Sequence, residues 1–208
     1  KNLEYRGYDS AGLAYISNQK LNTLKSIGKL NKLKSKFDLI EKDVYDVSIA
    51  IGHTRWATHG KVIIENTHPI ISENIAVVHN GIIENHDILR SELEKKKVVF
   101  ESTTDTEVIP HLLNLSIKNK NNFFDSCVEV INKIEGAYAF AAIESSKDQI
   151  FVSRKTSPLV LGLGDGFKVV GSDAQSISQI VSEVIYLDDG DYAFLSASKV
   201  EIFDKNNN

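Results

Sequence analysis

The sequence predicts an α+β protein in which antiparallel sheets lie inside and helices lie outside. Short apolar runs recur through the second half of the chain, and turn signals such as residues 145–148 and 188–191 separate them by only a few residues. Connections this short favour hairpins, because a parallel crossover needs a dozen or more residues. Stretches with helical periodicity, such as residues 30–40 and 86–97, lie between the groups of strands.

The first half of the chain is predicted to open with a hairpin that turns at Asn18. Residues 55–72 show no clear period and include Gly60 and Pro69, so we predict a long ordered loop there. A loop of that length in a compact domain is usually functional or disordered. The predicted elements are strands at 11–17, 19–27, 47–54 and 75–79, helices at 30–40 and 86–97, and a short strand at 98–100.

The second half is predicted to begin with two helices. Residues 102–105 supply capping candidates for a helix that runs to about residue 118, and Pro110 inside it should kink the helix or shift its start. The second helix covers residues 123–134 and is closed by Gly136. The remaining elements are predicted strands at 137–144, 149–153, 159–162, 167–171, 184–187, 192–196 and 200–203, and a short helix near 174–181.

The composition limits the classes of partner. Of the 208 residues, 42% are hydrophobic and 25% are charged, as is typical of a globular protein. The formal net charge of −4 argues against a general nucleic-acid-binding surface. No apolar run reaches the roughly eighteen residues that a membrane-spanning helix needs. We therefore expect neither nucleic acid nor a membrane as a partner.

The single cysteine, Cys127, indicates where the protein works. One thiol excludes a disulfide within the chain and suits a reducing compartment, so we expect the cytoplasm. Cys127 lies among apolar residues of the predicted helix 123–134 and is expected to be buried and structural.

Residues 52–60 combine Arg, Trp, two Thr and two His between apolar runs. Buried polar groups need partners, so this segment predicts either a satisfied network or a binding site. The planar guanidinium of Arg55 suits a carboxylate, and Asp105, at the mouth of a predicted helix, could hold an ammonium group. Facing each other across a pocket, the two would fit a zwitterionic amino acid. The alternative is that they pair with each other or with solvent.

Asn80 and Gly81 end the predicted strand 75–79 and allow two interpretations. An Asn amide and a neighbouring backbone N–H can converge on the negative oxygen of a tetrahedral intermediate, which predicts an oxyanion hole. Asn-Gly is also the preferred pair of a type I′ hairpin turn. The residues alone leave both interpretations open.

No cofactor or metal is expected. The histidines lack the i, i+4 spacing of a helical zinc pair, and Cys127 has no C-x-x-C partner. Residues 162–166 resemble part of a phosphate loop, but no Lys-Ser/Thr follows, which favours a hairpin turn. The histidines considered are His53, His59, His68, His79, His86 and His111.

Several motifs resemble the glutaminase domain of the glutamine–fructose-6-phosphate aminotransferases, within the N-terminal-nucleophile amidotransferase family. The resemblance covers essentially the whole chain, and three of the motifs run for eight residues or more without a gap. It implies a glutamine amidotransferase domain over residues 1–205, followed by a linker stub at 206–208. The matching segments are residues 3–12, 53–60, 78–86, 104–108, 136–138 and 157–159.

The resemblance implies a four-layer αββα sandwich and a cysteine nucleophile at the mature N-terminus. That cysteine attacks the glutamine carboxamide, with its own α-amino group as base. The chain contains no methionine and begins at Lys1, so we expect its true beginning, including this cysteine and a strand, to lie upstream. We therefore expect an unpaired sheet edge and an inactive fragment.

The resemblance also implies roles for individual residues. Arg55 would bind the glutamine carboxylate and Asp105 the α-ammonium group, while Asn80 and Gly81 would form the oxyanion hole. The remaining implied positions are Trp56, Thr58 and His59 in a loop that closes over glutamine, with Trp56 gating the ammonia path, and Arg6 and Tyr8 near the nucleophile.

The implied activity is hydrolysis of L-glutamine to supply ammonia for glucosamine 6-phosphate synthesis from fructose 6-phosphate. The ammonia would pass to a C-terminal sugar-phosphate isomerase half, absent from this chain, in a full-length homodimer. The alternatives are a non-catalytic amino-acid-binding module and the glutaminase domain of an amidophosphoribosyltransferase.

Overall fold

The computed structural model describes residues 7–40, 44, 46–56, 61–119 and 122–206. No helix in these ranges is long and apolar enough to cross a lipid bilayer. The elements are β1 (Ser10–Ser17), β2 (Lys20–Ile27), α1 (Leu30–Asp38), β3 (Val47–Arg55), β4 (Ile70–Ser72), β5 (Ile75–Ile83), α2 (His86–Lys95), a 3₁₀ turn η3 (Asp105–Glu107), α3 (Val108–Lys118), α4 (Phe123–Ile131), β6 (Gly136–Glu144), β7 (Ile150–Lys155), β8 (Val160–Gly164), β9 (Phe167–Gly171), α5 (Ala174–Ile177), β10 (Glu183–Tyr186), β11 (Tyr192–Leu195) and β12 (Val200–Phe203).

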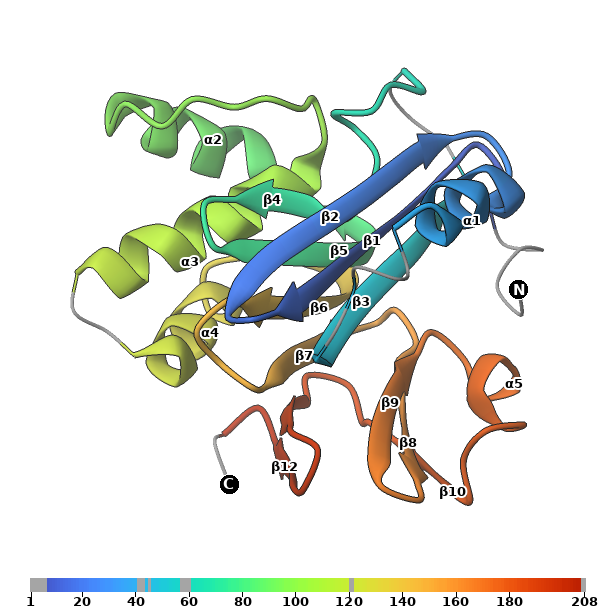
Figure 1. Ribbon diagram of the computed structural model, residues 1–208. Helices are drawn as coiled ribbons and strands as arrows, with labels where there is room; N and C mark the ends of the chain where they lie inside the picture. Colours follow the sequence, from blue (N-terminus) through green and yellow to red (C-terminus); the bar gives the residue numbers. More distant parts are fainter. Residues whose placement is uncertain (1–6, 41–43, 45, 57–60, 120–121, 207–208) are drawn as a thin grey trace.

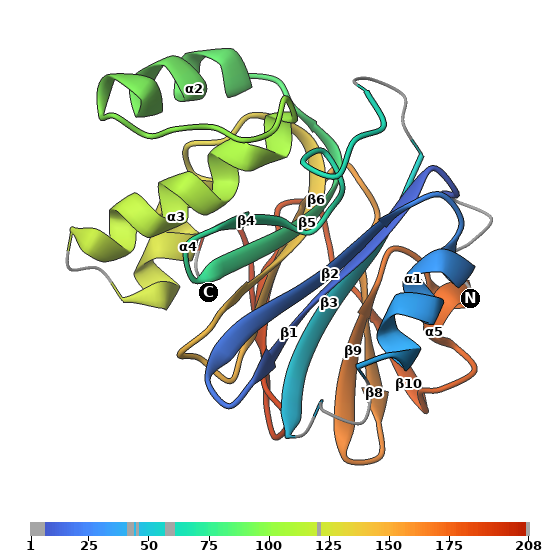
Figure 2. The same ribbon diagram turned by 45° about the horizontal axis from the view of Figure 1, so that its top comes forward.

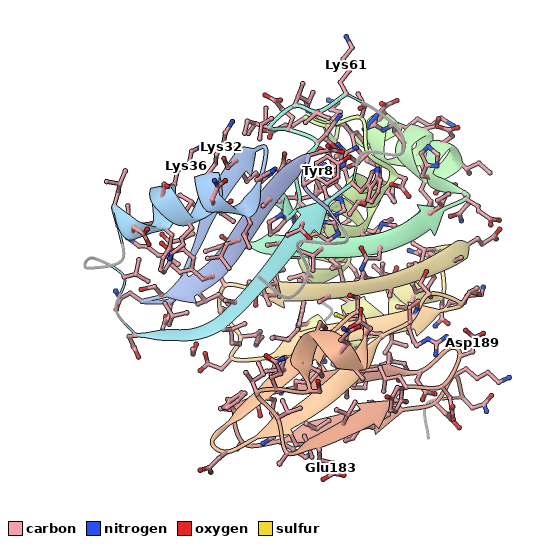
Figure 3. All side chains as sticks on the ribbon, turned by 90° about the vertical axis from the view of Figure 1, so that its right-hand side faces the viewer. Tyr8, Lys32, Lys36, Lys61, Glu183 and Asp189 are labelled. Atoms are coloured by element: carbon pink, nitrogen blue, oxygen red, sulfur yellow. The ribbon has the colours of Figure 1, made fainter. Side chains whose placement is uncertain are left out.

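A six-stranded antiparallel sheet, in the order β12-β11-β7-β6-β5-β4, lies in the middle of the molecule. Helices α2, α3 and α4 cover one face (Figure 1). Two three-stranded antiparallel sheets, β2-β1-β3 and β10-β8-β9, cover the other, with α1 and α5 outside them (Figures 2 and 3). The predicted α+β class, with antiparallel sheets between helical layers, is confirmed.

The six-stranded sheet is buried on both faces, so successive residues of its strands enter two different cores. In β6, Tyr138 and Phe140 pack in the core beneath the helices, whereas Ala139, Ala141 and Ile143 pack in the core beneath the small sheets. This follows from the alternation of side chains along a strand. It explains why residues 137–143 are continuously apolar rather than alternating.

The two faces of the sheet differ in side-chain size. Toward the helices the strands direct mainly aromatic side chains, which contact one another with ring centroids about 5–6 Å apart. Toward the small sheets, β5, β6 and β11 direct several alanines, which let a second sheet approach closely. The aromatic residues are Tyr138, Phe140, Phe151, Tyr192 and Phe194, and the alanines are Ala76, Ala139, Ala141 and Ala193.

The hairpin predicted at Asn18 is present. β1 and β2 pair from Ser17 opposite Lys20, so the loop consists of Asn18 and Gln19. Both have positive φ, 51° and 58°, as a type I′ turn requires. The second predicted strand therefore starts one residue later than expected.

Three expectations about strands are wrong. Strand β5 does not end before Asn80 but continues to Ile83, because β6 pairs with it along its whole length. Residues 98–100 form no strand, since Val98 and Phe100 bury their side chains against the helix-side core instead. Within the predicted loop 55–72, Ile70–Ser72 pairs with β5 as β4, a strand too short to show a period.

The helix predictions also need correction at their ends. None of the predicted cap residues caps η3 or α3 through its side chain. Pro110 lies in the first turn of α3, where a missing N–H breaks no helical hydrogen bond, and η3 precedes it, so the start is shifted rather than the helix kinked. Helix α4 ends at Ile131, and its N-terminus is capped by Asn122.

Gly136 does not close a helix as predicted but begins β6. Its φ is +125°, and a Cβ there would lie 2.2 Å from the Ile82 carbonyl oxygen. The close approach of β6 to β5 therefore requires glycine at this position.

Substitution of Gly136 should separate steric from conformational cost. We expect Gly136→Ala to lower the free energy of unfolding by more than about 3 kcal/mol, because it combines a positive φ with a backbone clash. Gly166→Ala is the matched control, since its φ is +76° but nothing lies within 4 Å of the added Cβ, so it should cost only about 1 kcal/mol. Urea unfolding of both variants measures the difference, and equal losses would contradict the packing argument.

Candidate active site

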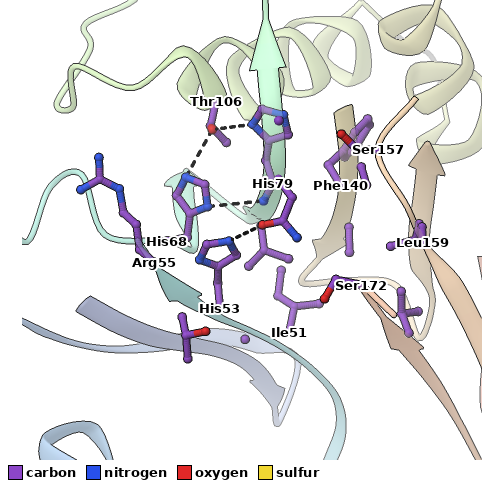
Figure 4. Close-up of a pocket in the computed structure, with 18 of the residues that line it drawn as sticks. Ile51, His53, Arg55, His68, His79, Thr106, Phe140, Ser157, Leu159 and Ser172 are labelled. Carbon is purple, nitrogen blue, oxygen red and sulfur yellow. Dashed lines mark hydrogen bonds between the residues drawn. The ribbon is translucent and has the colours of Figure 1, made fainter. Parts of the chain in front are cut away.

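A cavity of about 900 Å³ opens between β3, the end of β5, the loop before η3, and β9 (Figure 4). Strands β3 and β9 each pair with one neighbour within the described part of the chain, so both present an edge to this region. The cavity is lined by five of the predicted site residues, namely Arg55, Trp56, Asn80, Gly81 and Asp105. The other three, Arg6, Thr58 and His59, lie outside the described residues.

Arg55 and Asp105 supply the charges of the cavity. Arg55 is the last residue of β3, and burial lowers the pKa of its guanidinium while the carboxylates of Asp9 and Asp105 oppose that shift. Asp105 begins η3, and its Oδ2 accepts a 2.7 Å hydrogen bond from the Ile83 N–H at the end of β5. The structure therefore places a cation and a carboxylate on one cavity, as the sequence predicts for an amino-acid ligand.

Asn80 and Gly81 lie within β5, opposite Ala139 and Tyr138 of β6. The alternative that they form a hairpin turn is therefore wrong. Gly81 has a φ of +122°, and a Cβ there would lie 2.0 Å from the Ala137 carbonyl oxygen, so no other residue fits. The Asn80 side chain is exposed to the cavity, and its Oδ1 lies 2.9 Å from His53 Nε2.

Three histidines, His53, His68 and His79, form one side of the cavity (Figure 4). The His68 ring lies 4.6 Å from the His53 ring and 6.5 Å from the His79 ring, measured between centroids. The His79 main-chain N–H donates to His68 Nδ1 at 3.4 Å. Thr106 Oγ1 lies 3.3 Å from His68 Nε2 and 2.9 Å from His79 Nδ1.

These contacts connect His68, Thr106 and His79. Because His68 Nδ1 accepts from a backbone N–H, a neutral His68 carries its proton on Nε2, which faces Thr106 Oγ1. Thr106 Oγ1 also lies within hydrogen-bond distance of His79 Nδ1. The result is a closed ring of hydrogen bonds between β5, η3 and the segment that precedes β4.

The histidine cluster is uncharged. Burial lowers the pKa of His53, lowers that of His68 far below its usual range, and lowers that of His79 to about 4. Mutual repulsion and the nearby Arg55 add to the lowering for His68. The sequence interpretation treated these residues only as metal ligands and missed this network, although His53 and His79 each lie in a polar motif at a strand.

Glu107 organises the loop that carries Asp105. It is 2% exposed, and it accepts hydrogen bonds from the Glu101 N–H at 2.8 Å and from the Ser102 N–H and hydroxyl at 2.7 and 2.6 Å. His111 Nε2 lies 3.3 Å from it and Arg90 3.7 Å. Burial alone would raise the pKa of Glu107, but the hydrogen bonds outweigh it and lower the pKa to about 2.

A second link fixes the outer part of the same loop. Asn66 is fully buried, accepts from the Thr103 N–H at 3.0 Å, and donates to the Lys61 carbonyl at 3.1 Å. Asn66 and Thr103 both line the cavity. This residue was not predicted, because an asparagine in an irregular segment carries no sequence signal that distinguishes it from a turn residue.

Cys127 is buried, as expected. It has no exposed surface, lies in the helix-side core on α4, and burial raises the pKa of its thiol well above the usual range. A thiol in that environment is a poor nucleophile. It does not line the cavity.

Trp56 lines the cavity, and the ring of Tyr8 lies beside it. Their ring centroids are 5.4 Å apart, and the two residues are 54% and 50% exposed. Large exposed aromatic side chains beside a polar cavity are typical of a surface that closes over a ligand or contacts a partner.

Comparison with known proteins identifies the class. The family described as "Glutamine amidotransferase domain" matches residues 53–179, and the chain belongs to that family. Its fold is that of the N-terminal-nucleophile amidotransferases. Over the whole chain the TM-score is 0.81, with 26% identity, to 45% of a glutamine phosphoribosylpyrophosphate amidotransferase from B. subtilis.

The relatives are more specific than the fold. The chain is 43% identical over 210 residues to the glutamine–fructose-6-phosphate aminotransferase (isomerizing) of Idiomarina loihiensis, matching 100% of this chain and 34% of that protein. It is 43% identical over 199 residues to the enzyme of the same name from Thermococcus kodakarensis, with 94% and 33% covered. The chain thus spans about a third of the length of these curated relatives, and it is homologous to their glutaminase half.

Replacement of Glu107 should make stability less dependent on pH. The pKa of Glu107 is lowered in the folded chain, so its stabilisation is present above about pH 4.5 and is lost as the pH falls toward 2. We expect Glu107→Gln to lower the free energy of unfolding by about 2–3 kcal/mol at pH 7 and by much less at pH 3. Denaturation across this range measures the effect. Glu92→Gln on the exposed side of α2 is the control and should change stability by less than about 0.5 kcal/mol.

Proposed function

We propose that this chain is the glutaminase half of an enzyme that hydrolyses L-glutamine and uses the ammonia to make glucosamine 6-phosphate from fructose 6-phosphate. The observation that carries the proposal is the meeting of Arg55, Asp105, Asn80 and Gly81 on one cavity. They come from three separate segments of the chain, and together they offer a site for each polar group of glutamine. The similarity to the aminotransferases supports the choice of acceptor.

Glutamine would be held by its amino-acid end. Arg55 would pair with the α-carboxylate through its planar fork of N–H donors, and Asp105 with the α-ammonium group. Because Asp105 Oδ2 already accepts the Ile83 N–H, its carboxylate is oriented before a ligand arrives. This arrangement would leave the carboxamide free to extend toward Asn80 and Gly81.

The reaction requires a thiolate that this cavity can receive. Buried Cys127 cannot supply it, and the resemblance to the family assigns the role to a cysteine at the mature N-terminus. Its sulfur would attack the carboxamide carbon, with the proton taken by its own α-amino group. The oxyanion would accept hydrogen bonds from Asn80 Nδ2 and the Gly81 N–H. Collapse, with that proton passed from the α-ammonium group to the leaving nitrogen, would expel ammonia and leave a thioester, which water hydrolyses to glutamate and the free thiol.

The remaining residues would close the site. We infer that Trp56 belongs to the loop that covers glutamine and gates the path of ammonia, and its exposed ring beside Tyr8 supports this role. The family motifs alone assign Thr58 and His59 to the same loop and Arg6 to the neighbourhood of the nucleophile. A full-length homodimer in the cytoplasm, with ammonia passed to the sugar-phosphate half, belongs to the same proposal.

The full-length protein tests the proposal directly. Incubated with glutamine and fructose 6-phosphate, it should form glutamate and glucosamine 6-phosphate in equal amounts. The structural likeness to a phosphoribosylpyrophosphate amidotransferase makes phosphoribosyl diphosphate the alternative acceptor to compare. Amine transfer to phosphoribosyl diphosphate would favour that second function, and binding of glutamine without glutamate release would indicate a non-catalytic module.

Replacement of Arg55 should weaken substrate binding. We expect Arg55→Lys to raise the KM for glutamine about 10- to 100-fold with a smaller effect on kcat, because lysine cannot reproduce a bidentate pair. Steady-state kinetics of glutamate release measure both. Arg154→Lys removes a guanidinium that bonds the Leu187 carbonyl away from the cavity, and it should leave KM unchanged.

Replacement of Asn80 should affect the chemical step. Loss of one oxyanion donor typically lowers kcat about 10²- to 10³-fold, so we expect Asn80→Ala to do so with little change in KM. Asn85→Ala, which removes an amide bonded to the Lys133 carbonyl outside the cavity, is the control. A rise in KM without a fall in kcat would show that Asn80 binds the ground state instead.

A further inference from the structure

The amide of Asn80 can face the cavity with either of two ends. An amide nitrogen donates hydrogen bonds, whereas an amide oxygen only accepts them. Turned with Oδ1 toward an oxyanion, Asn80 would repel the charge that it is proposed to stabilise. Something must therefore select the end that faces the ligand.

His53 makes that selection in this structure. Its Nε2 lies 2.9 Å from Asn80 Oδ1, so the oxygen end of the amide is occupied. Within the described residues no hydrogen bond engages Asn80 Nδ2, which leaves the donor end available to a ligand. His53 comes from β3 and Asn80 from β5, so the contact joins two sheets across the cavity.

The contact works only if His53 carries its proton on Nε2. The His79 main chain also lies near the ring and opposes the lowering of its pKa, but the other ring nitrogen, Nδ1, is shielded from solvent and makes no hydrogen bond of good geometry with the described residues. A buried N–H without an acceptor is rarer in proteins than an under-satisfied acceptor, which favours an unprotonated Nδ1. Because burial lowers the pKa of His53, the ring is neutral and its single proton is on Nε2.

The ring of His53 is itself held in place. The His68 ring packs against it at 4.6 Å between centroids, and His68 is 6% exposed. His68 is fixed in turn by the hydrogen bonds to the His79 backbone and Thr106. Reorientation of His53 would therefore require displacement of a buried neighbour.

We propose that His53 is a positioning residue that holds the Asn80 amide with its nitrogen toward the oxyanion, through an Nε2–H donated to Asn80 Oδ1. This inference rests on the proposed glutaminase function and adds to it a role that His53 performs through another residue. His53 need not contact the substrate itself.

The test compares two replacements of His53 in the full-length protein. His53→Leu fills similar space without a donor, so the Asn80 amide is free to rotate, and kcat for glutamate release should fall about 10- to 100-fold with KM changed less than about 3-fold. His53→Gln places an amide N–H at a similar reach and should recover most of the lost kcat. A His53→Gln variant as slow as His53→Leu would overturn the proposal.

A double-mutant cycle separates positioning from a general structural effect. In an Asn80→Ala background, where no amide is left to orient, His53→Leu should lower kcat by less than about 2-fold. An equal fall in both backgrounds would overturn the proposal. Val130→Ala, which truncates a buried side chain of α4 outside the cavity, is the control for folding and should lower the thermal midpoint without changing kcat.

The aldehyde analogue of glutamine gives a second readout, because its adduct with a thiol carries the tetrahedral oxygen. His53→Leu should weaken inhibition by this aldehyde about 10-fold or more and leave inhibition by glutamate unchanged, whereas equal weakening of both would overturn the positioning role. If the unsubstituted full-length protein released no glutamate, the proposed function would fail and this inference with it. Active protein that His53→Leu leaves unaffected would overturn this inference alone.

Discussion

The pairing of β5 with β6 positions both hydrophobic cores and the residues of the cavity. Nine consecutive residue pairs join the two strands, from Ile75 opposite Glu144 to Ile83 opposite Gly136. This register assigns each side chain of β6 to one of the two cores and brings Asn80 and Gly81 to the cavity. A slip of one residue would exchange the faces of the whole strand, so the hydrophobic pattern and the site are specified by the same contacts. Gly136 and Gly81 make that register accessible, since neither position has room for a Cβ.

The cavity separates its charged groups from its neutral ones. Arg55 and Asp105 lie where they can meet a charged ligand, whereas the buried histidines carry no charge and are held by hydrogen bonds to Thr106 and to the backbone. A buried charge without a partner would cost far more than a neutral imidazole. The histidines on one side of the cavity can therefore be held in a fixed orientation without adding charges that would compete with Arg55 and Asp105 for the ligand.

Much of the fold could be predicted because local signals and tertiary structure agree. Asn18 marked the first hairpin, and the apolar runs of β6, β7 and β11 were visible without any partner. The wrong predictions concern segments whose conformation depends on a part of the chain that is distant in the sequence. Whether Asn80 and Gly81 turn the chain or continue the strand depends on β6, which lies more than fifty residues away. The apolar run at 98–100 packs against the helix-side core and forms no strand.

The residues of the site likewise fall into those that the sequence could identify and those that it could not. Arg55 and Asp105 are charged residues at the end of a predicted strand and at the start of a predicted helix, so the sequence could identify them. Asn80 and Gly81 could be identified from their motif. Glu107 and Asn66 could not, because each is identified only by the groups it holds, and their partners at Ser102 and Thr103 include main-chain N–H groups. The histidine ring of hydrogen bonds likewise exists only once β5, η3 and the segment before β4 meet.

The alanines on one face of the six-stranded sheet have a consequence for how such a chain can diverge. Ala139 and Ala141 line the cavity, so part of its volume exists because these side chains end at Cβ. On the helix side, one large apolar residue can replace another at modest cost, since the total volume is kept. On the alanine side, each added carbon takes space from the ligand and pushes two sheets apart. Substitutions on that side are therefore limited to residues no larger than alanine. The size of the ligand that fits the cavity then depends on residues that make no polar contact with it.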